Sequence, residues 1–172
     1  LNKDVRQYHI FRGGDIIYYY SPHTEKHQTW SVLFQELFKP TQLVTQEIDK
    51  QNLDKNSYFA VHLRFVNTLE YFENSNSCPL NEDEKSKLIS GCIDQILALK
   101  RINQNRKALV CSDSQIFLDR IRNYKGIIVL DGKLGHITYT GKAEEIVLKT
   151  FLDFFMISRA SKIYSIIYPQ MY

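Results

Sequence analysis

Short apolar runs alternate with helical stripes through most of this chain, and this alternation restricts the fold more than any other feature. Each run is rich in Val, Ile or aromatic residues and has the length of a buried strand. The predicted strands are 58–65, 108–111, 127–130 and 161–167, and the helical stripes between them lie within 88–97, 116–121 and 146–155. Repeated strand–helix–strand units predict an α/β domain, a Rossmann-like doubly wound parallel sheet with helices on both faces.

The pattern of apolar and polar residues changes near residue 52, which predicts that the chain consists of two parts. Residues 1–52 carry an aromatic run and two short helical patterns, and they end in a polar stretch at 49–52 that has the composition of a linker. Residues 53–172 carry the regular alternation. Asn81 with Glu84 three residues later predicts a capping box at the start of the first helix of this second part.

Composition and charge exclude several classes of protein. The net charge is only +3, with Lys and Arg scattered along the chain, so we expect no nucleic-acid partner. The three cysteines, Cys78, Cys92 and Cys111, form neither a disulfide framework nor a pair with zinc-site spacing, which favours a reducing, cytoplasmic location.

The sequence also bears on membranes. No apolar run reaches the roughly 20 residues that a membrane helix requires. The chain starts at Leu1 and stops at Tyr172, so we treat it as a candidate fragment. Any signal, anchor or peripheral membrane association would then come from segments that this sequence does not contain.

Polar residues stand where a doubly wound domain binds its ligands, beyond the carboxyl ends of the strands. His62 and Arg64 end the first predicted strand, and strand alternation places both on one side, where they could address one anionic group. Ser112 and Asp113 end the second. Each also has a structural alternative: a core histidine for His62, a salt bridge at the sheet rim for Arg64, and helix capping for the Ser112–Ser114 segment.

The common phosphate-binding fingerprints are missing. No G-x-G-x-x-G follows a predicted strand, so a nicotinamide or flavin cofactor is not expected, and no Walker-type loop is present. No Asp-x-Asp metal motif occurs either. We expect neither a cofactor nor a metal.

Three segments together resemble the GDP-fucose-dependent fucosyltransferases of the protein O-fucosyltransferase, α1,6 and α1,2 superfamily. Residues 61–65 (Val-His-Leu-Arg-Phe) resemble the family's H-x-R strand, and 110–114 (Val-Cys-Ser-Asp-Ser) its strand ending in Thr/Ser-Asp. Residues 151–160 are similar to its L-D-x-x-x-L-S/G-x-A-D helix. The resemblance covers about residues 57–168 and implies the donor-binding half of a GT-B glycosyltransferase, with residues 1–52 a remnant of the acceptor lobe or a clasp onto it.

The resemblance also implies a role for each matching residue. Arg64 would bind the β-phosphate of GDP-fucose and stabilise the departing GDP, and His62 would contact the diphosphate or ribose. Asp153 would accept hydrogen bonds from guanine N1 and N2, and Ser112 and Asp113 would lie beside the nucleotide or support the loop. The implied reaction is an inverting, metal-independent transfer of fucose to a hydroxyl of a glycan or protein.

The chain departs from the family in three places that keep other interpretations open. Residues 166–170 stand where the family has a Ser-Ser/Gly-Phe turn, residues 66–70 stand where the protein O-fucosyltransferases usually carry an acidic segment, and Phe65 replaces the second basic residue of the α1,6 enzymes. The alternatives are a non-catalytic nucleotide- or glycan-binding module, and a transferase with another nucleotide donor. No general base is assigned; Asp15, Glu70 and Glu73 are candidates only as carboxylates.

Overall fold

The computed structural model describes residues 36–65, 68–69, 80–104, 106–135 and 144–166. The chain divides into two compact units, residues 1–41 and 42–172. The second unit begins at Gln42, earlier than the expected boundary at residue 53, because the helix Gln42–Lys50 contacts the helix Glu144–Ser158 of this unit. Most of the first unit lies outside the described residues, and so do Asp15, Glu70, Glu73 and Cys78.

Helices and strands alternate in the second unit as the sequence predicted. In chain order they are α3 (Gln42–Lys50), β1 (Tyr58–Leu63), α4 (Glu82–Ile102), β2 (Lys107–Ser112), α5 (Gln115–Ile121), β3 (Ile127–Ile128), α6 (Glu144–Ser158) and β4 (Ile163–Ile166). All four predicted strands are present. β1 ends two residues earlier than predicted and β3 is only two residues long.

The four strands form one parallel sheet in the order β3-β2-β1-β4. β1 pairs with β2 on one side, Val61 opposite Val110, and with β4 on the other, His62 opposite Ser165. The chain thus adds strands in one direction from β1 and then crosses back to place β4 on the other side of β1. This order matches the first four strands of the doubly wound 3-2-1-4-5-6 sheet, whose direction reverses between β1 and β4.

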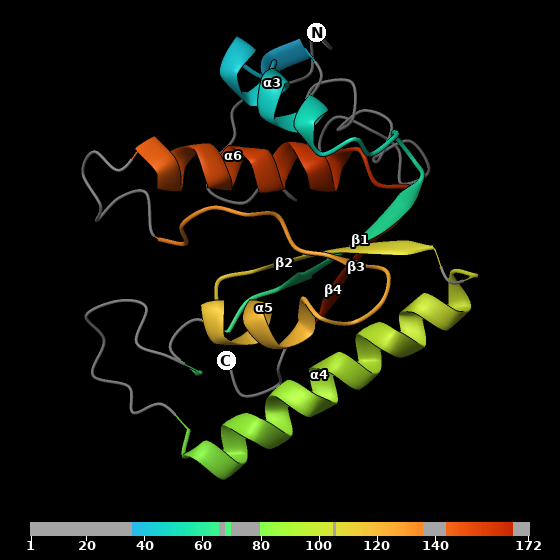
Figure 1. Cartoon of the computed structure of the whole chain (residues 1–172), viewed down its shortest axis with the longest axis vertical. Coiled ribbons are helices and arrows are strands. Elements are labelled where there is room, and N and C mark those ends of the chain that lie inside the picture. The colour runs from blue at the N-terminus through green and yellow to red at the C-terminus, as the bar shows by residue number, and fades with distance from the viewer. Residues whose placement is uncertain (1–35, 66–67, 70–79, 105, 136–143, 167–172) are drawn as a thin grey trace, which may run out of the picture. The chain divides into compact units, whose positions relative to one another are not determined.

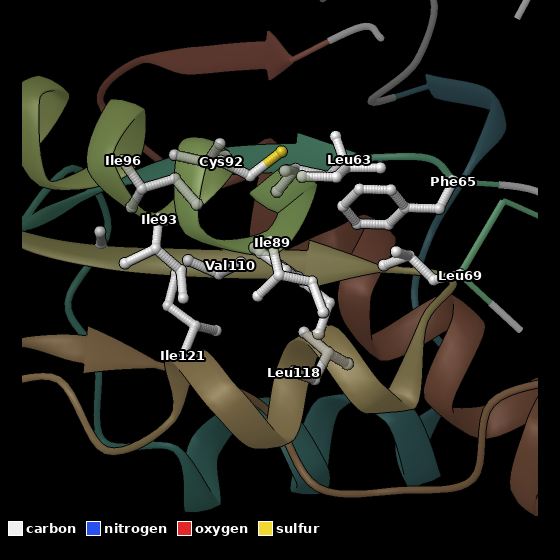
Figure 2. Close-up of a cluster of buried hydrophobic side chains, with 14 of the residues drawn as sticks. Leu63, Phe65, Leu69, Ile89, Cys92, Ile93, Ile96, Val110, Leu118 and Ile121 are labelled. Carbon is white, nitrogen blue, oxygen red and sulfur yellow. The ribbon is translucent and has the colours of Figure 1, made fainter. Parts of the chain in front are cut away.

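Alternation along β1 sends its side chains to opposite faces of the sheet. Phe59, Val61 and Leu63 enter a buried cluster with apolar side chains of β2, α4 and α5. Figure 2 shows side chains of this cluster packed together, among them Ile89, Cys92, Ile93, Ile96, Val110, Leu118 and Ile121. The other face of the sheet is covered by α6, with α3 beyond it, while α4 and α5 lie on the cluster side (Figure 1).

The start of α4 confirms the predicted capping box. The Glu84 backbone N–H donates to Asn81 Oδ1 at 3.0 Å, and the Asn81 N–H donates to Glu84 Oε2 at 3.0 Å. Two of the free N–H groups at the helix start are satisfied in this way. Among the described residues, no helix is long and apolar enough to cross a bilayer.

Candidate functional site

A cavity of about 280 Å³ opens on the α6 face of the sheet, at the carboxyl ends of β1 and β2. α6 forms one wall, and the segment that follows β3 forms another. The lining residues are His62, Cys111, Ser112, Asp113, Lys133, Leu134, Gly135, Lys149, Thr150, Asp153, Phe154 and Ile157. A doubly wound sheet places its ligand-binding crevice at this end of the strands.

His62 reaches the cavity, whereas Arg64 does not. His62 is the one exposed side chain of β1, with its neighbours Val61 and Leu63 buried in the core on the opposite face. Arg64 follows the last residue of the strand and is exposed, but it is not part of the cavity wall. Among the described residues it has no ion-pair partner, so the rim salt bridge considered from the sequence does not form with any of them.

The residues that end β2 have structural contacts as well as a place in the cavity wall. Asp113 Oδ1 accepts a hydrogen bond from the Phe65 backbone N–H at 2.7 Å, which ties the end of β1 to the end of β2. Ser112 is buried, and its hydroxyl accepts from the Ser114 N–H at 3.2 Å. Ser114 itself caps α5 by accepting from the Phe117 N–H at 3.3 Å. Ser112 and Asp113 therefore at least support the loop between β2 and α5.

Asp153 lies in the cavity wall in an ion pair with Lys149, one helical turn earlier on α6. Both side chains are largely removed from solvent, with 4% of Lys149 and 16% of Asp153 exposed. Burial raises the pKa of the Asp153 carboxyl above its ordinary value, and the Lys149 ammonium, the Cys111 thiol and His62 partly offset that rise. His62 and Asp153, proposed from separate motifs, thus belong to one electrostatic cluster.

Cys111, on β2, lines the same cavity and is a further member of this cluster. Burial, followed by the charge of Asp153, raises its thiol pKa well above the ordinary value. A thiol held protonated in this way is a weak nucleophile. Cys111 therefore contributes a small, weakly polar wall to the cavity and no covalent chemistry.

Sequence reasoning missed Lys149, although a signal was present. Lys149 stands between Ile146 and Leu152 at helical spacing, on the face of α6 that is otherwise apolar and buried. A lysine on such a face needs a partner, and Asp153 four residues later is the spacing at which helical charges meet. Two other polar wall residues that the sequence did not nominate, Lys133 and Thr150, carry no comparable signal.

Comparisons with models of protein families, with curated proteins and with solved structures found no match to this chain. The candidate site therefore rests on the sequence and on the geometry described above. Within the described part of the chain, no three His, Cys, Asp or Glu side chains are grouped so that they could hold a metal ion.

Proposed function

We propose that this chain is the donor-binding half of a GT-B, fucosyltransferase-like glycosyltransferase, and that its cavity takes the nucleotide of GDP-fucose. One observation carries the proposal. The cavity lies at the carboxyl ends of parallel strands in the 3-2-1-4 order and combines basic groups, His62 and Lys133, with the carboxylate of Asp153. A nucleoside diphosphate needs both kinds of group, cations for its phosphates and acceptors for the N–H donors of its base.

In the proposed complex, the phosphates lie toward the end of β1 and the base lies toward α6. His62 contacts the diphosphate from the cavity wall. Arg64 stands just outside that wall with its guanidinium unpaired among the described residues, and it meets the charge that grows on the β-phosphate as the glycosidic bond breaks. Asp153 accepts from the guanine ring, and the exposed Phe154 beside it offers an apolar surface to the base.

A thermal-shift panel of GDP, UDP, ADP and CDP tests the nucleotide site. A ligand present at 100 times its dissociation constant adds about 2.7 kcal/mol to the stability of the protein. We expect the largest shift with GDP. No shift with any of the four would refute a nucleotide site, and equal shifts with GDP and UDP would favour a transferase with a different donor over the role given to Asp153.

Arg64→Ala tests catalysis. We expect it to fold normally and to lose about 100- to 1000-fold in fucose transfer, the loss of roughly 2.7–4 kcal/mol that follows removal of one preorganised charge-stabilising donor. Arg106→Ala is the matched control, because Arg106 is also exposed but precedes β2, at the opposite end of the strands. Near-normal transfer by the Arg64 variant would refute the enzymatic assignment.

The position of Arg64 outside the cavity wall also favours a second candidate, a nucleotide-binding module without catalysis. Such a module would use His62 and Asp153 for affinity and would need no charge stabilisation at a leaving group. Isothermal titration separates the two functions. GDP binding combined with an absence of both transfer and hydrolysis of GDP-fucose would support the module.

A further inference from the structure

We propose that Lys149 is the positioning residue for base recognition in this site: it holds the Asp153 carboxylate in place, so that Asp153 can accept hydrogen bonds from the N–H groups of a purine ring. The inference rests on the proposed nucleotide site. It adds a residue that no motif pointed to, and it makes the selectivity of the site depend on an ion pair inside α6.

The first support is the contact itself. Lys149 Nζ pairs with Asp153 Oδ2 across one helical turn, with only 4% of the lysine side chain exposed. The second oxygen, Asp153 Oδ1, is buried and has no N–H or O–H donor among the described residues. A buried acceptor of this kind is normally satisfied by a ligand or an ordered water. Besides Lys149, the described residues give this carboxylate only the weakly donating Cys111 thiol as a hydrogen-bond partner, so acceptor capacity is left for a ligand.

The second support is the way in which the lysine is held. Gly132, in the segment after β3, has a φ of +133°, and a Cβ added there would lie 2.7 Å from Lys149 Cδ. The backbone of this segment thus packs directly against the aliphatic part of the Lys149 side chain. A side chain packed in this manner has little rotamer freedom, so the ammonium group stays at Asp153 and does not turn toward solvent.

The third support is the balance of charges around the carboxyl. Lys149 reaches it from α6, the Cys111 thiol from β2 and His62 from β1, while Lys133 and Asp113 lie elsewhere in the cavity wall. Burial raises the pKa of Asp153, and among these groups Lys149 opposes the rise most. Without Lys149, the carboxyl would take up a proton at a higher pH. A protonated carboxyl presents a donor where the guanine edge also presents donors.

The test compares GDP affinity of the wild-type chain and Lys149→Met by titration calorimetry between about pH 5.5 and 8.5. We expect the variant to bind more weakly at the acid end of this range, by up to about tenfold for each unit by which the loss of Lys149 raises the Asp153 pKa, and to recover as the pH rises. Inosine diphosphate, which lacks the 2-amino group, should lose less affinity than GDP when Lys149 is replaced by Met.

Two further variants separate positioning from simple loss of charge or fold. Lys133→Met removes a cation from the same cavity without touching Asp153, and its loss of affinity should vary little with pH. The double variant Lys149→Met/Asp153→Asn removes both buried charges; it keeps the volume, should melt near the wild type, and should bind GDP weakly at every pH. It therefore reports on the site even if the single variant is unstable.

The outcomes distinguish this inference from the function on which it rests. If the wild-type chain binds none of the nucleotides, the proposed function and the role of Lys149 both fall. If the wild type binds GDP but Lys149→Met binds it equally well with the same pH profile, the nucleotide site stands and the role of Lys149 is refuted. A double variant that binds GDP like the wild type would refute it too.

Discussion

Tyr58 shows how a single side chain can join two elements that are far apart in the sequence. It begins β1, is fully buried, and donates its hydroxyl to the Met156 carbonyl oxygen near the end of α6 at 2.6 Å. Burial raises the pKa of its phenol to about 12, although the Arg159 charge works in the opposite direction. The hydroxyl is therefore protonated throughout the neutral range and acts only as a donor.

Tyr58→Phe should lower the free energy of unfolding by about 0.5–1.5 kcal/mol at neutral pH, the net value of one hydrogen bond. The unfolded phenol ionises near pH 10 and the folded one near 12, so the stability from Tyr58 is complete below pH 10 and is lost as the pH rises toward 12. The advantage of the wild type over the variant should thus shrink above pH 10 and then reverse in alkaline urea melts, because a shift of about two pKa units outweighs one hydrogen bond. Tyr124→Phe, at a residue 41% exposed, should change little at any pH; a constant gap for Tyr58→Phe would contradict the argument.

Asp153 and Lys149 show how far single residues could be predicted. The resemblance of the segment around Asp153 to a family motif nominated the aspartate as a base-recognition residue, and it does lie in the cavity wall. The apolar helical face around Lys149 indicates that it lies near the core, but its full burial also depends on the segment after β3, which packs against its side chain. The binding roles of His62, Arg64, Ser112, Asp113 and Asp153 stay predictions until a ligand is tested.

At the scale of the element, α4 depends on its first turn. Its N-terminus has the Asn81–Glu84 capping box and three acidic residues in the first turn, which interact favourably with the positive end of the helix dipole. The helix is 21 residues long and supplies Leu88, Ile89, Cys92, Ile93 and Ile96 to the core. The contacts of the first turn therefore stabilise the start of the helix that supplies these core side chains.

Asn81→Ala should lower the free energy of unfolding by about 1 kcal/mol, within the range of 0.5–2 kcal/mol for loss of a cap. Ser90→Ala is the control, because Ser90 is exposed in the middle of the same helix and caps nothing. Chemical denaturation of both variants gives the comparison. Equal stabilities for the two would show that the capping contacts contribute nothing.

The ends of the strands were the least predictable part of the elements. The apolar run continues through Phe65, yet β1 ends at Leu63, the last residue paired with both neighbours, Ser112 on β2 and Ile166 on β4. β3 pairs only with Ala108 and Leu109, although its apolar run extends to Leu130. Strand length is set by the neighbouring strands, which a pattern within one segment does not contain.

At the scale of the whole domain, stability comes from the cluster between the sheet and α4 and α5. Ile96 is fully buried within it, and Ile102 at the end of the same helix is 72% exposed. Ile96→Ala should cost about 2–5 kcal/mol, because it removes buried methyl groups and leaves a cavity. Ile102→Ala should stay within about 0.5 kcal/mol of the wild type. Similar thermal melts for the two variants would contradict the assignment of the core.

The sequence by itself determined the succession of strands and helices, the parallel α/β class and the cap of α4, because each depends on periodicity or on neighbours within a few residues. Only the tertiary structure decided the strand order, the burial of Lys149 and the joining of His62, Cys111 and Asp153 in one cavity. These depend on pairings such as His62 opposite Ser165 and on α6 crossing the sheet, contacts between residues about a hundred positions apart. Local patterns hold no information on such contacts. The contacts are selected by the free energy of burying side chains between the sheet and its helices, and that burial exists only once these layers have packed together.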